Sequence, residues 1–367
     1  MWGSYHFGVE IELIAAPHQV RHPLLRAVYY EKLAAALRSQ GAQAVADRLE
    51  GSYGKHPEHY DKWWITKDGS LGNPDHPLIP LEAVSPILNT AYHWERDVDT
   101  FWNAWNRVFR MPNSSRLCGS HVHVSPSPSK RFTVAQLQSI AFGVIHYENE
   151  VMQLLPWHRQ ENDYCQPNSE HSVALQEMAD GSPNQDLRPM EVWDKIRRMD
   201  SRQDIRDLMQ HRTGSRKDRY VLWNFDNVLD GKSGSVEFRG GRGLRGPVRT
   251  KRWIAFVVAF AHFCIRQNFH SWLRSRFRAP NMQQFWTGLL NAAQSISVKD
   301  SLPSDWQAMA EMMSDGLNEG LCDFDDSDSD KGSMMSKSDS EFTESDYSDG
   351  DLEADFEINI YSNKEHY

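Results

Sequence analysis

The chain has 367 residues, of which 40% are hydrophobic, so there is ample material for a large core. Its net charge of −10 is concentrated near the C-terminus, where residues 323–357 hold 14 Asp and Glu against two Lys, and the rest of the chain is near neutral. A near-neutral body without a basic stripe argues against nucleic-acid binding. The longest apolar run, residues 253–265, contains His262 and is too short to cross a bilayer.

The elements expected from hydrophobic periodicity and from breaker residues alternate between strands and helices. In chain order they are a strand over 7–14, a helix over 24–40, a pair of strands over 63–66 and 81–85, a helix over 92–109, a strand over 117–125, a helix over 133–155, an irregular segment over 156–190, a helix over 190–210, strands over 219–225 and 235–239, and helices over 248–273, 282–293 and 305–317. Thr133 and Gln136 are placed as a capping box.

The chain divides into a folded body over residues 1–321 and an acidic, Ser-rich tail over residues 322–367. Such a tail buries too little apolar surface to offset its chain entropy, so it is predicted to be disordered. Its serines among acidic residues are candidate sites for an acid-directed kinase or for a protein partner, although a purely solvating tail explains them equally well.

The four cysteines are scattered, without a CxxC pair, which argues against a zinc knuckle or a disulfide framework. The N-terminus lacks the basic-then-apolar pattern of a signal peptide. Together these features predict a cytoplasmic protein.

Two of the predicted strands each carry a pair of ionisable residues on one face. Side chains two apart on a strand share a face, so Glu10 and Glu12 point the same way between apolar neighbours, and so do His121 and His123. The ordinary explanation is a half-solvated strand with its polar face in water. That explanation does not account for the residue types, because adjacent like charges repel and Glu is a poor strand former.

A third strand repeats the pattern with Glu237 and Arg239. Carboxylates and imidazoles from several strands resemble a set of metal ligands, and a divalent cation would turn their repulsion into binding energy. Because hard cations prefer oxygen donors, the set predicts Mg²⁺ or Mn²⁺. The His-x-His pair also occurs in zinc hydrolases, so that alternative stays open.

A series of short motifs then matches a known family in order. They are Phe-Gly-Val-Glu-Ile-Glu-Leu at residues 7–13, Trp-Ile-Thr-Lys-Asp-Gly-Ser-Leu at 64–71, Glu-Ala-Val-Ser-Pro at 82–86, Cys-Gly-Ser-His-Val-His-Val at 118–124, Arg-Tyr-Val-Leu-Trp-Asn at 219–224 and Val-Glu-Phe-Arg at 236–239. Over residues 5–270 the chain thus resembles the amidoligase family of carboxylate–amine ligases, which are related to glutamine synthetase and γ-glutamylcysteine synthetase. Gly-Gly-Arg-Gly at residues 240–243 departs from the family's usual continuation.

The resemblance implies an α+β fold in which a curved, funnel-like antiparallel sheet of the glutamine-synthetase type carries helices on its outer face. It implies ATP and Mg²⁺ (or Mn²⁺) as cofactors, with small-molecule or peptide carboxylates and amines as substrates. The implied metal ligands are Glu10, Glu12, Glu82, His121 and Glu237.

The resemblance also assigns residues that contact the reactants. Arg239 is expected to face the transferred phosphate and Asp68 to orient or deprotonate the amine. Substrate or nucleotide contacts are expected from His123, Arg159 and Lys67.

Arg242 and Arg245 follow the Glu-x-Arg strand as a basic cluster that could bind a carboxylate or ATP phosphates, and a solvated loop explains them as well. The sequence therefore predicts an ATP-dependent ligase that forms an amide through an acyl phosphate. A metal-dependent hydrolase and a catalytically inactive binding module remain as alternatives.

Overall fold

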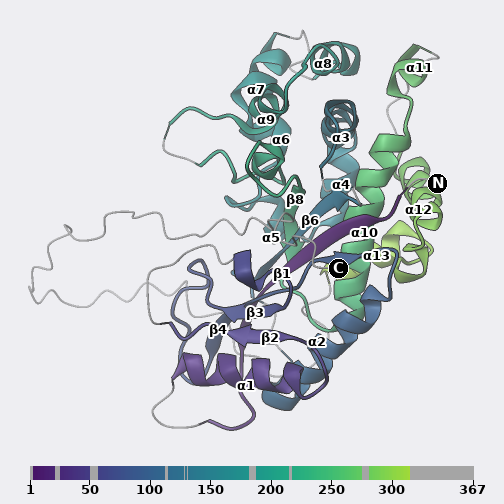
Figure 1. Ribbon diagram of the computed structural model, residues 1–367. Coiled ribbons are helices and arrows are strands. Elements are labelled where there is room, and N and C mark those ends of the chain that lie inside the picture. Colours follow the sequence, from purple (N-terminus) through teal and green to yellow (C-terminus); the bar gives the residue numbers. More distant parts are fainter. Residues whose placement is uncertain are drawn as a thin grey trace, which may run out of the picture.

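The computed structural model describes residues 3–20, 25–49, 57–111, 115–127, 129, 131–181, 187–214, 217–274 and 281–314. Its centre is an open eight-stranded sheet in the order β2-β3-β4-β1-β6-β8-β7, with β5 paired to one end of β1 (Figure 1). The strands are β1 (Tyr5–Ala15), β2 (Ala44–Ala46), β3 (Trp63–Thr66), β4 (Ile79–Val84), β5 (Leu88–Asn89), β6 (Gly119–Pro126), β7 (Trp223–Asn224) and β8 (Val236–Arg242). Among them β2 and β3 pair in parallel and the other pairs are antiparallel.

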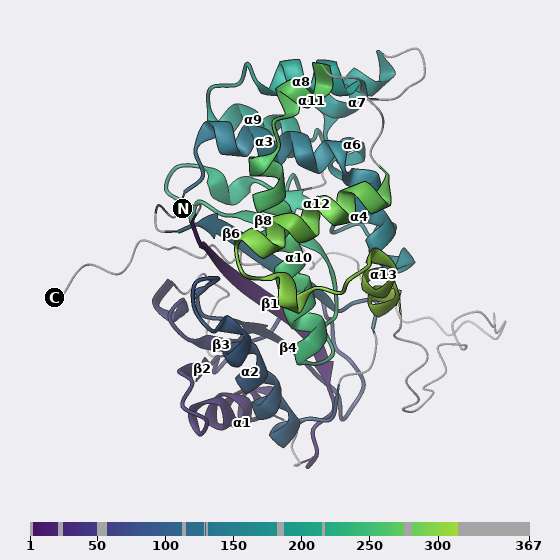
Figure 2. The ribbon, with the colours of Figure 1, turned by 90° about the vertical axis from the view of Figure 1, so that its right-hand side faces the viewer.

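Thirteen α-helices in the described residues pack around this sheet and on one another. They are α1 (Arg26–Arg38), α2 (Trp94–Val108), α3 (Val134–His146), α4 (Glu148–Leu154), α5 (Trp157–Gln160), α6 (Asn168–His171), α7 (Val173–Asp180), α8 (Pro189–Ile196), α9 (Arg202–Gln210), α10 (Pro247–Arg266), α11 (Phe269–Arg274), α12 (Met282–Ser295) and α13 (Trp306–Ser314). The long helix α10 packs against β1, β6, α2, α3 and α12. Figure 2 shows α10 and α12 in front of the sheet and α1 with α2 at its lower end.

The alternation of β1 explains why the sheet has one apolar and one functional face. Val9 and Ile11 are fully buried in the core that α10 completes, while Glu10 and Glu12, which alternate with them, point to the opposite face. The predicted α+β class, with an antiparallel sheet and helices packed on it, is confirmed. The finer glutamine-synthetase-like geometry stays a prediction.

The strands expected over 7–14, 63–66, 81–85 and 117–125 are confirmed, and β3 pairs with β4 as predicted. The single helix predicted over 133–155 is wrong. Tyr147 leaves helical geometry at φ −106° and ψ 15° and separates α3 from α4. Its ring packs between Phe263 and Phe285, so tertiary contacts accompany a break that local propensity does not indicate. The capping box of Thr133 and Gln136 is confirmed.

Four other segment predictions need correction. The helix expected over 248–273 is divided into α10 and α11. The helix expected over 190–210 is two helices, α8 and α9. The segment 156–190 holds α5, α6 and α7 and the start of α8, so it is not irregular throughout. The strand expected over 219–225 is confined to the two residues of β7, which pair with β8.

In the part of the chain that the structure describes, every helix is too short or too polar to span a membrane. The acidic tail predicted over residues 322–367, with its candidate phosphorylation sites, lies outside the described residues.

Gly241 lies where β8 approaches its neighbours closely. A Cβ atom built on Gly241 would lie 2.1 Å from Ser120 Oγ and 2.4 Å from Trp253 Nε1. The pairing of β6 with β8 is also irregular here, between Ser120 and Val122. Close approach of β8 to its neighbours therefore requires glycine at this position.

We expect Gly241→Ala to lower the free energy of unfolding by about 3 kcal/mol, because the added methyl group must displace a neighbouring strand and a buried Trp. Gly69→Ala is the matched control, since no heavy atom lies within 4 Å of the Cβ that it adds. Urea denaturation of both variants measures the difference. Equal midpoints for the two would contradict the packing argument.

Candidate active site

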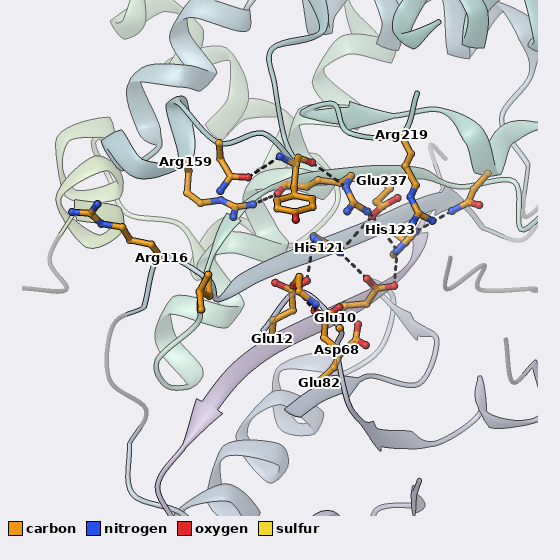
Figure 3. Close-up of a pocket in the computed structure, with 17 residues that line it drawn as sticks. Glu10, Glu12, Asp68, Glu82, Arg116, His121, His123, Arg159, Arg219 and Glu237 are labelled. Atoms are coloured by element: carbon orange, nitrogen blue, oxygen red, sulfur yellow. Dashed lines mark hydrogen bonds and ion pairs between the residues drawn. The ribbon is translucent and has the colours of Figure 1, made fainter. Parts of the chain in front are cut away.

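The functional face of the sheet brings together ionisable side chains from four adjacent strands. In the strand register Glu10 lies opposite His121, and Glu12 lies opposite Glu82. On the other side of β6, His123 lies opposite Glu237. The strands β4, β1, β6 and β8 thus present a continuous row of carboxylates and imidazoles (Figure 3).

These side chains line one pocket of about 900 Å³, counted out to its open mouth. The lining residues are Glu10, Glu12, Asp68, Gly69, Ser70, Glu82, Arg116, Leu117, His121, His123, Arg159, Asn162, Tyr164, Arg219, Asn227, Glu237 and Arg239.

The carboxylates of this pocket are withdrawn from solvent. Glu10 is 5% exposed, Glu82 4% and Glu237 3%. The ordinary alternative of a half-solvated strand face is therefore wrong for these strands. Burying several carboxylates together is costly unless they are paired or bind a cation, so the cluster needs a compensating charge.

Glu10 sits between the two histidines of β6. Its Oε2 lies 2.8 Å from His121 Nδ1 and its Oε1 lies 3.0 Å from His123 Nε2. Burial acts to raise the pKa of Glu10, but His123 and His121 outweigh burial and hold that pKa well below its usual range. Burial likewise opposes protonation of His123, while Glu237 and Glu10 raise its pKa. Glu10 is therefore an ionised ligand candidate at neutral pH.

Glu12, two residues further along β1, occupies a different environment. Its Oε2 accepts a hydrogen bond of 2.7 Å from the backbone N–H of Gly119. Burial and, to a lesser extent, the nearby Asp68 raise the pKa of Glu12, against the lowering effect of His121 and two arginines. A Cβ atom on residue 119 would lie 2.6 Å from this carboxylate oxygen, so Gly119 makes room for Glu12.

Glu237 is fixed at both of its oxygens. Oε1 accepts a hydrogen bond of 2.7 Å from Arg239, and Oε2 accepts one of 2.8 Å from Asn224 Nδ2. Burial acts to raise the pKa of Glu237, but Arg239, His123 and His121 lower it on balance. Like Glu10, Glu237 is held as a carboxylate.

Three of these residues could share one ion. Ligand atoms of Glu10, His123 and Glu237 all lie within 4.8 Å of one another. Two carboxylates and one imidazole suit Mg²⁺ or Mn²⁺, whose coordination is dominated by oxygen. The donor set therefore fits the predicted divalent metal, and His123 joins it although it was expected only beside the ligands.

A family model described as "Putative amidoligase enzyme" matches residues 3–261. The chain belongs to this family. Membership in the amidoligase family indicates a ligase, in agreement with the resemblance seen in the sequence. A comparison with curated proteins finds no match.

The pocket of this amidoligase collects nine of the residues singled out from the sequence. They are Glu10, Glu12, Asp68, Glu82, His121, His123, Arg159, Glu237 and Arg239. Lys67, Arg242 and Arg245 are not part of the lining. Arg242 is buried in β8 beside Gly119, and Lys67 precedes the pocket residue Asp68. Their predicted contacts with substrate or nucleotide stay predictions.

Sequence reasoning missed several residues of the pocket, among them Arg116, Tyr164, Arg219 and Asn227. All four lie outside the regular strands, where the alternation of side chains gives no signal. Arg219 belongs to a family motif, which could have marked it as a candidate.

Asn224 was noted in the same motif without a role, and the structure places it behind Glu237. Its Oδ1 accepts hydrogen bonds of 2.9 Å from Gln210 Nε2 and from the backbone N–H of Asp226. These two donors leave its Nδ2 group to donate to Glu237. Asn224 therefore fixes the carboxylate orientation of a candidate metal ligand.

We expect Asn224→Leu to weaken Mn²⁺ binding by about 10- to 100-fold, the usual effect of losing a partner that orients a metal ligand. Asn224→Asp keeps the shape but replaces the donor with a second carboxylate beside Glu237, and we expect at least as large a loss. Calorimetric titration with Mn²⁺ measures both. Affinities within threefold of the wild type would show that Glu237 does not depend on Asn224.

Proposed function

We propose that this protein is an ATP-dependent carboxylate–amine ligase with a glutamine-synthetase-like catalytic fold. In the proposed reaction the carboxylate takes the γ-phosphoryl group of ATP and ADP leaves. The amine then attacks the acyl phosphate, giving an amide, phosphate and a proton. The observation that carries the proposal is a pocket in which buried carboxylates and imidazoles from four strands converge with several arginines. Family membership supports the ligase class.

The pocket has to accept two anionic reactants although its own wall is acidic. Bound Mg²⁺ or Mn²⁺ would offset the negative charge of the ATP phosphates and stabilise charge on the phosphoryl group during its transfer. Glu10, Glu12, Glu82, His121 and Glu237 would hold the metal, with His123 as a further ligand. Their burial keeps water away and strengthens every charge interaction inside the pocket.

Arg239 is the residue proposed to assist phosphoryl transfer. It lines the pocket, and its ion pair with Glu237 keeps the guanidinium next to the proposed metal ligands. A cation fixed there needs no reorganisation when charge develops on the phosphoryl oxygens.

Asp68 is the proposed base for the amine. It lies in the loop after β3, and its Oδ1 accepts a hydrogen bond of 2.6 Å from the backbone N–H of Ser70 and another from the Ser70 hydroxyl. These bonds aim the carboxylate into the pocket, where it could take the proton of the attacking amine.

The first experiment follows ADP and phosphate release from the purified protein with Mg²⁺ and ATP. A panel of carboxylates and amines is supplied singly and in pairs. A ligase gives stoichiometric ADP, phosphate and amide only with a matching pair. Substrate cleavage without nucleotide would instead support the metal-dependent hydrolase built on His121 and His123.

Calorimetry tests the site without knowledge of the substrates. The wild type and the Glu10→Gln/Glu12→Gln variant are titrated with a non-hydrolysable ATP analogue in the presence of Mg²⁺. We expect the variant to bind the analogue much more weakly, because two of the proposed metal-binding carboxylates are replaced by neutral amides. Equal nucleotide affinity in both proteins would count against the proposed site.

A further inference from the structure

The strand β7 lies at one edge of the sheet and is only two residues long. Its Trp223 and Asn224 pair with Phe238 and Glu237 of β8. A strand this short makes few ladder hydrogen bonds, yet Asn224 has to be held accurately enough to orient the carboxylate of Glu237. Other groups must therefore fix the side of β7 that faces away from β8.

Asn168 of α6 occupies that side in the place of a further strand, and its side chain is completely buried. Its Oδ1 accepts a hydrogen bond of 3.0 Å from the backbone N–H of Trp223, and its Nδ2 donates one of 2.8 Å to the Trp223 carbonyl oxygen. One side chain thus satisfies both backbone groups of an edge residue, as a neighbouring strand would. Nδ2 also donates a bond of 3.0 Å to the carbonyl oxygen of Met209, which ties the same amide to α9.

Gln210 of α9 completes this edge, and it too is completely buried. Its Oε1 accepts a hydrogen bond of 2.6 Å from the backbone N–H of Phe225. Because a backbone N–H can only donate, this bond fixes which end of the Gln210 amide is the oxygen. The Nε2 group must then donate, and its acceptors are the Oδ1 atoms of Asn224 and Asp226, both at 2.9 Å.

These assignments form one chain of donors and acceptors that ends at the candidate metal ligand. Gln210 donates to Asn224 Oδ1, and Asn224 Nδ2 donates at 2.8 Å to Glu237 Oε2. Turning either amide around would place donor against donor and acceptor against acceptor. Inside the protein an unmatched polar group is costly, so the chain favours one orientation of Asn224. That orientation presents an NH₂ group, and not an oxygen, to the carboxylate.

We propose that Asn168 and Gln210 are positioning residues for the candidate metal ligand Glu237. Asn168 fixes the backbone of β7, and Gln210 fixes the amide of Asn224 so that its NH₂ group faces Glu237. Both act from behind the sheet edge, since neither is among the residues that line the pocket. Their effect on metal binding rests on the proposed function, whereas the hydrogen-bond chain does not.

Calorimetric titration of the full-length protein with Mn²⁺ tests the proposal. We expect Gln210→Met and Asn168→Leu each to weaken Mn²⁺ binding by about 10-fold. Gln210→Glu keeps the acceptor for Phe225 but loses the donor, so we expect a loss at least as large. Gln138→Met is the matched control, because Gln138 also joins two segments, through a bond of 2.7 Å to the Met199 carbonyl oxygen, but does so between α3 and the segment after α8. Its Mn²⁺ affinity should equal that of the wild type.

A double-mutant cycle separates positioning from a general structural effect. In Asn224→Leu the chain ends before it reaches Glu237, so adding Gln210→Met should change Mn²⁺ affinity by less than about twofold. Equal losses from Gln210→Met in both backgrounds would overturn the proposal. Wild-type affinity of either single variant would overturn the role of that residue, and the Gln210 variants are sufficient if Asn168→Leu does not fold.

The side-chain amide of Asn224 gives a readout that needs no metal. Its NMR signal in ¹⁵N-labelled protein is assigned by its loss in Asn224→Leu. We expect Gln210→Met to speed solvent exchange of these NH₂ protons by about fivefold or more, because the bond to Glu237 is weakened. Faster exchange in Gln210→Met, together with a wild type that binds no Mn²⁺, would reject the proposed metal site and keep the chain. Unchanged exchange would reject the chain.

Discussion

Glu10→Gln is expected to weaken Mn²⁺ binding by at least about 100-fold. This exceeds the loss expected when a residue that only orients a metal ligand, such as Asn224, is replaced. Glu10 contacts both His121 and His123 and belongs to the group of three residues whose ligand atoms could share one ion. The amide of Gln keeps the size of the side chain but removes its charge. It also turns an NH₂ group toward one of the imidazoles. Calorimetry or Mn²⁺ electron paramagnetic resonance measures the change.

Glu148→Gln is the matched control for this prediction. Glu148 is also buried, at 7% exposure, but it binds Ser169 and lies outside the pocket lining. Burial raises the pKa of Glu148 to about 7, so Gln resembles its protonated form. We expect its Mn²⁺ affinity to equal that of the wild type. An equal loss in both variants would trace the effect to general damage, and no loss in Glu10→Gln would remove Glu10 from the metal site.

Arg239→Met is expected to lower kcat for ADP formation by about 10²- to 10³-fold, the usual effect of removing one preorganised donor to a transition-state charge. The reason is that Arg239 is held beside the proposed metal ligands by Glu237. Steady-state kinetics with a carboxylate–amine pair that supports turnover measures the change.

Arg239 also lowers the pKa of Glu237, so its loss could act through the metal. Titration with Mn²⁺ separates the two effects, and we expect metal affinity to fall by less than about 10-fold, as one neighbouring interaction of a ligand is lost. Arg239→Lys keeps the charge without the planar pair of donors and should recover part of kcat. If kcat follows metal affinity in every variant, Arg239 has no separate role in phosphoryl transfer.

Strand periodicity alone groups the candidate metal ligands of β1 and β6. A period of two on 7–14 and 117–125 assigned Glu10, Glu12, His121 and His123 to common faces, and the structure bears this out. The prediction works because alternation along a strand is a local property of the extended backbone.

The local sequence pattern predicts the structure less well where packing between distant segments decides the geometry. The break at Tyr147, the two short strands β2 and β5 and the shrinkage of 219–225 to β7 depend on contacts with distant residues. Loops that carry pocket residues, such as Arg116 and Arg219, have no period that marks one side of the chain as the inside.

The sequence by itself determined which residue types can share a face and, through its ordered motifs, the family. The tertiary structure alone decided that four strands lie in the order β4-β1-β6-β8, which brings Glu82, Glu10, His121 and Glu237 into one pocket. It also decided that Arg159 is buried there without a carboxylate partner among the described residues. The physical reason is that charge compensation and burial depend on distances between segments far apart in the chain, whereas alternation depends only on neighbours.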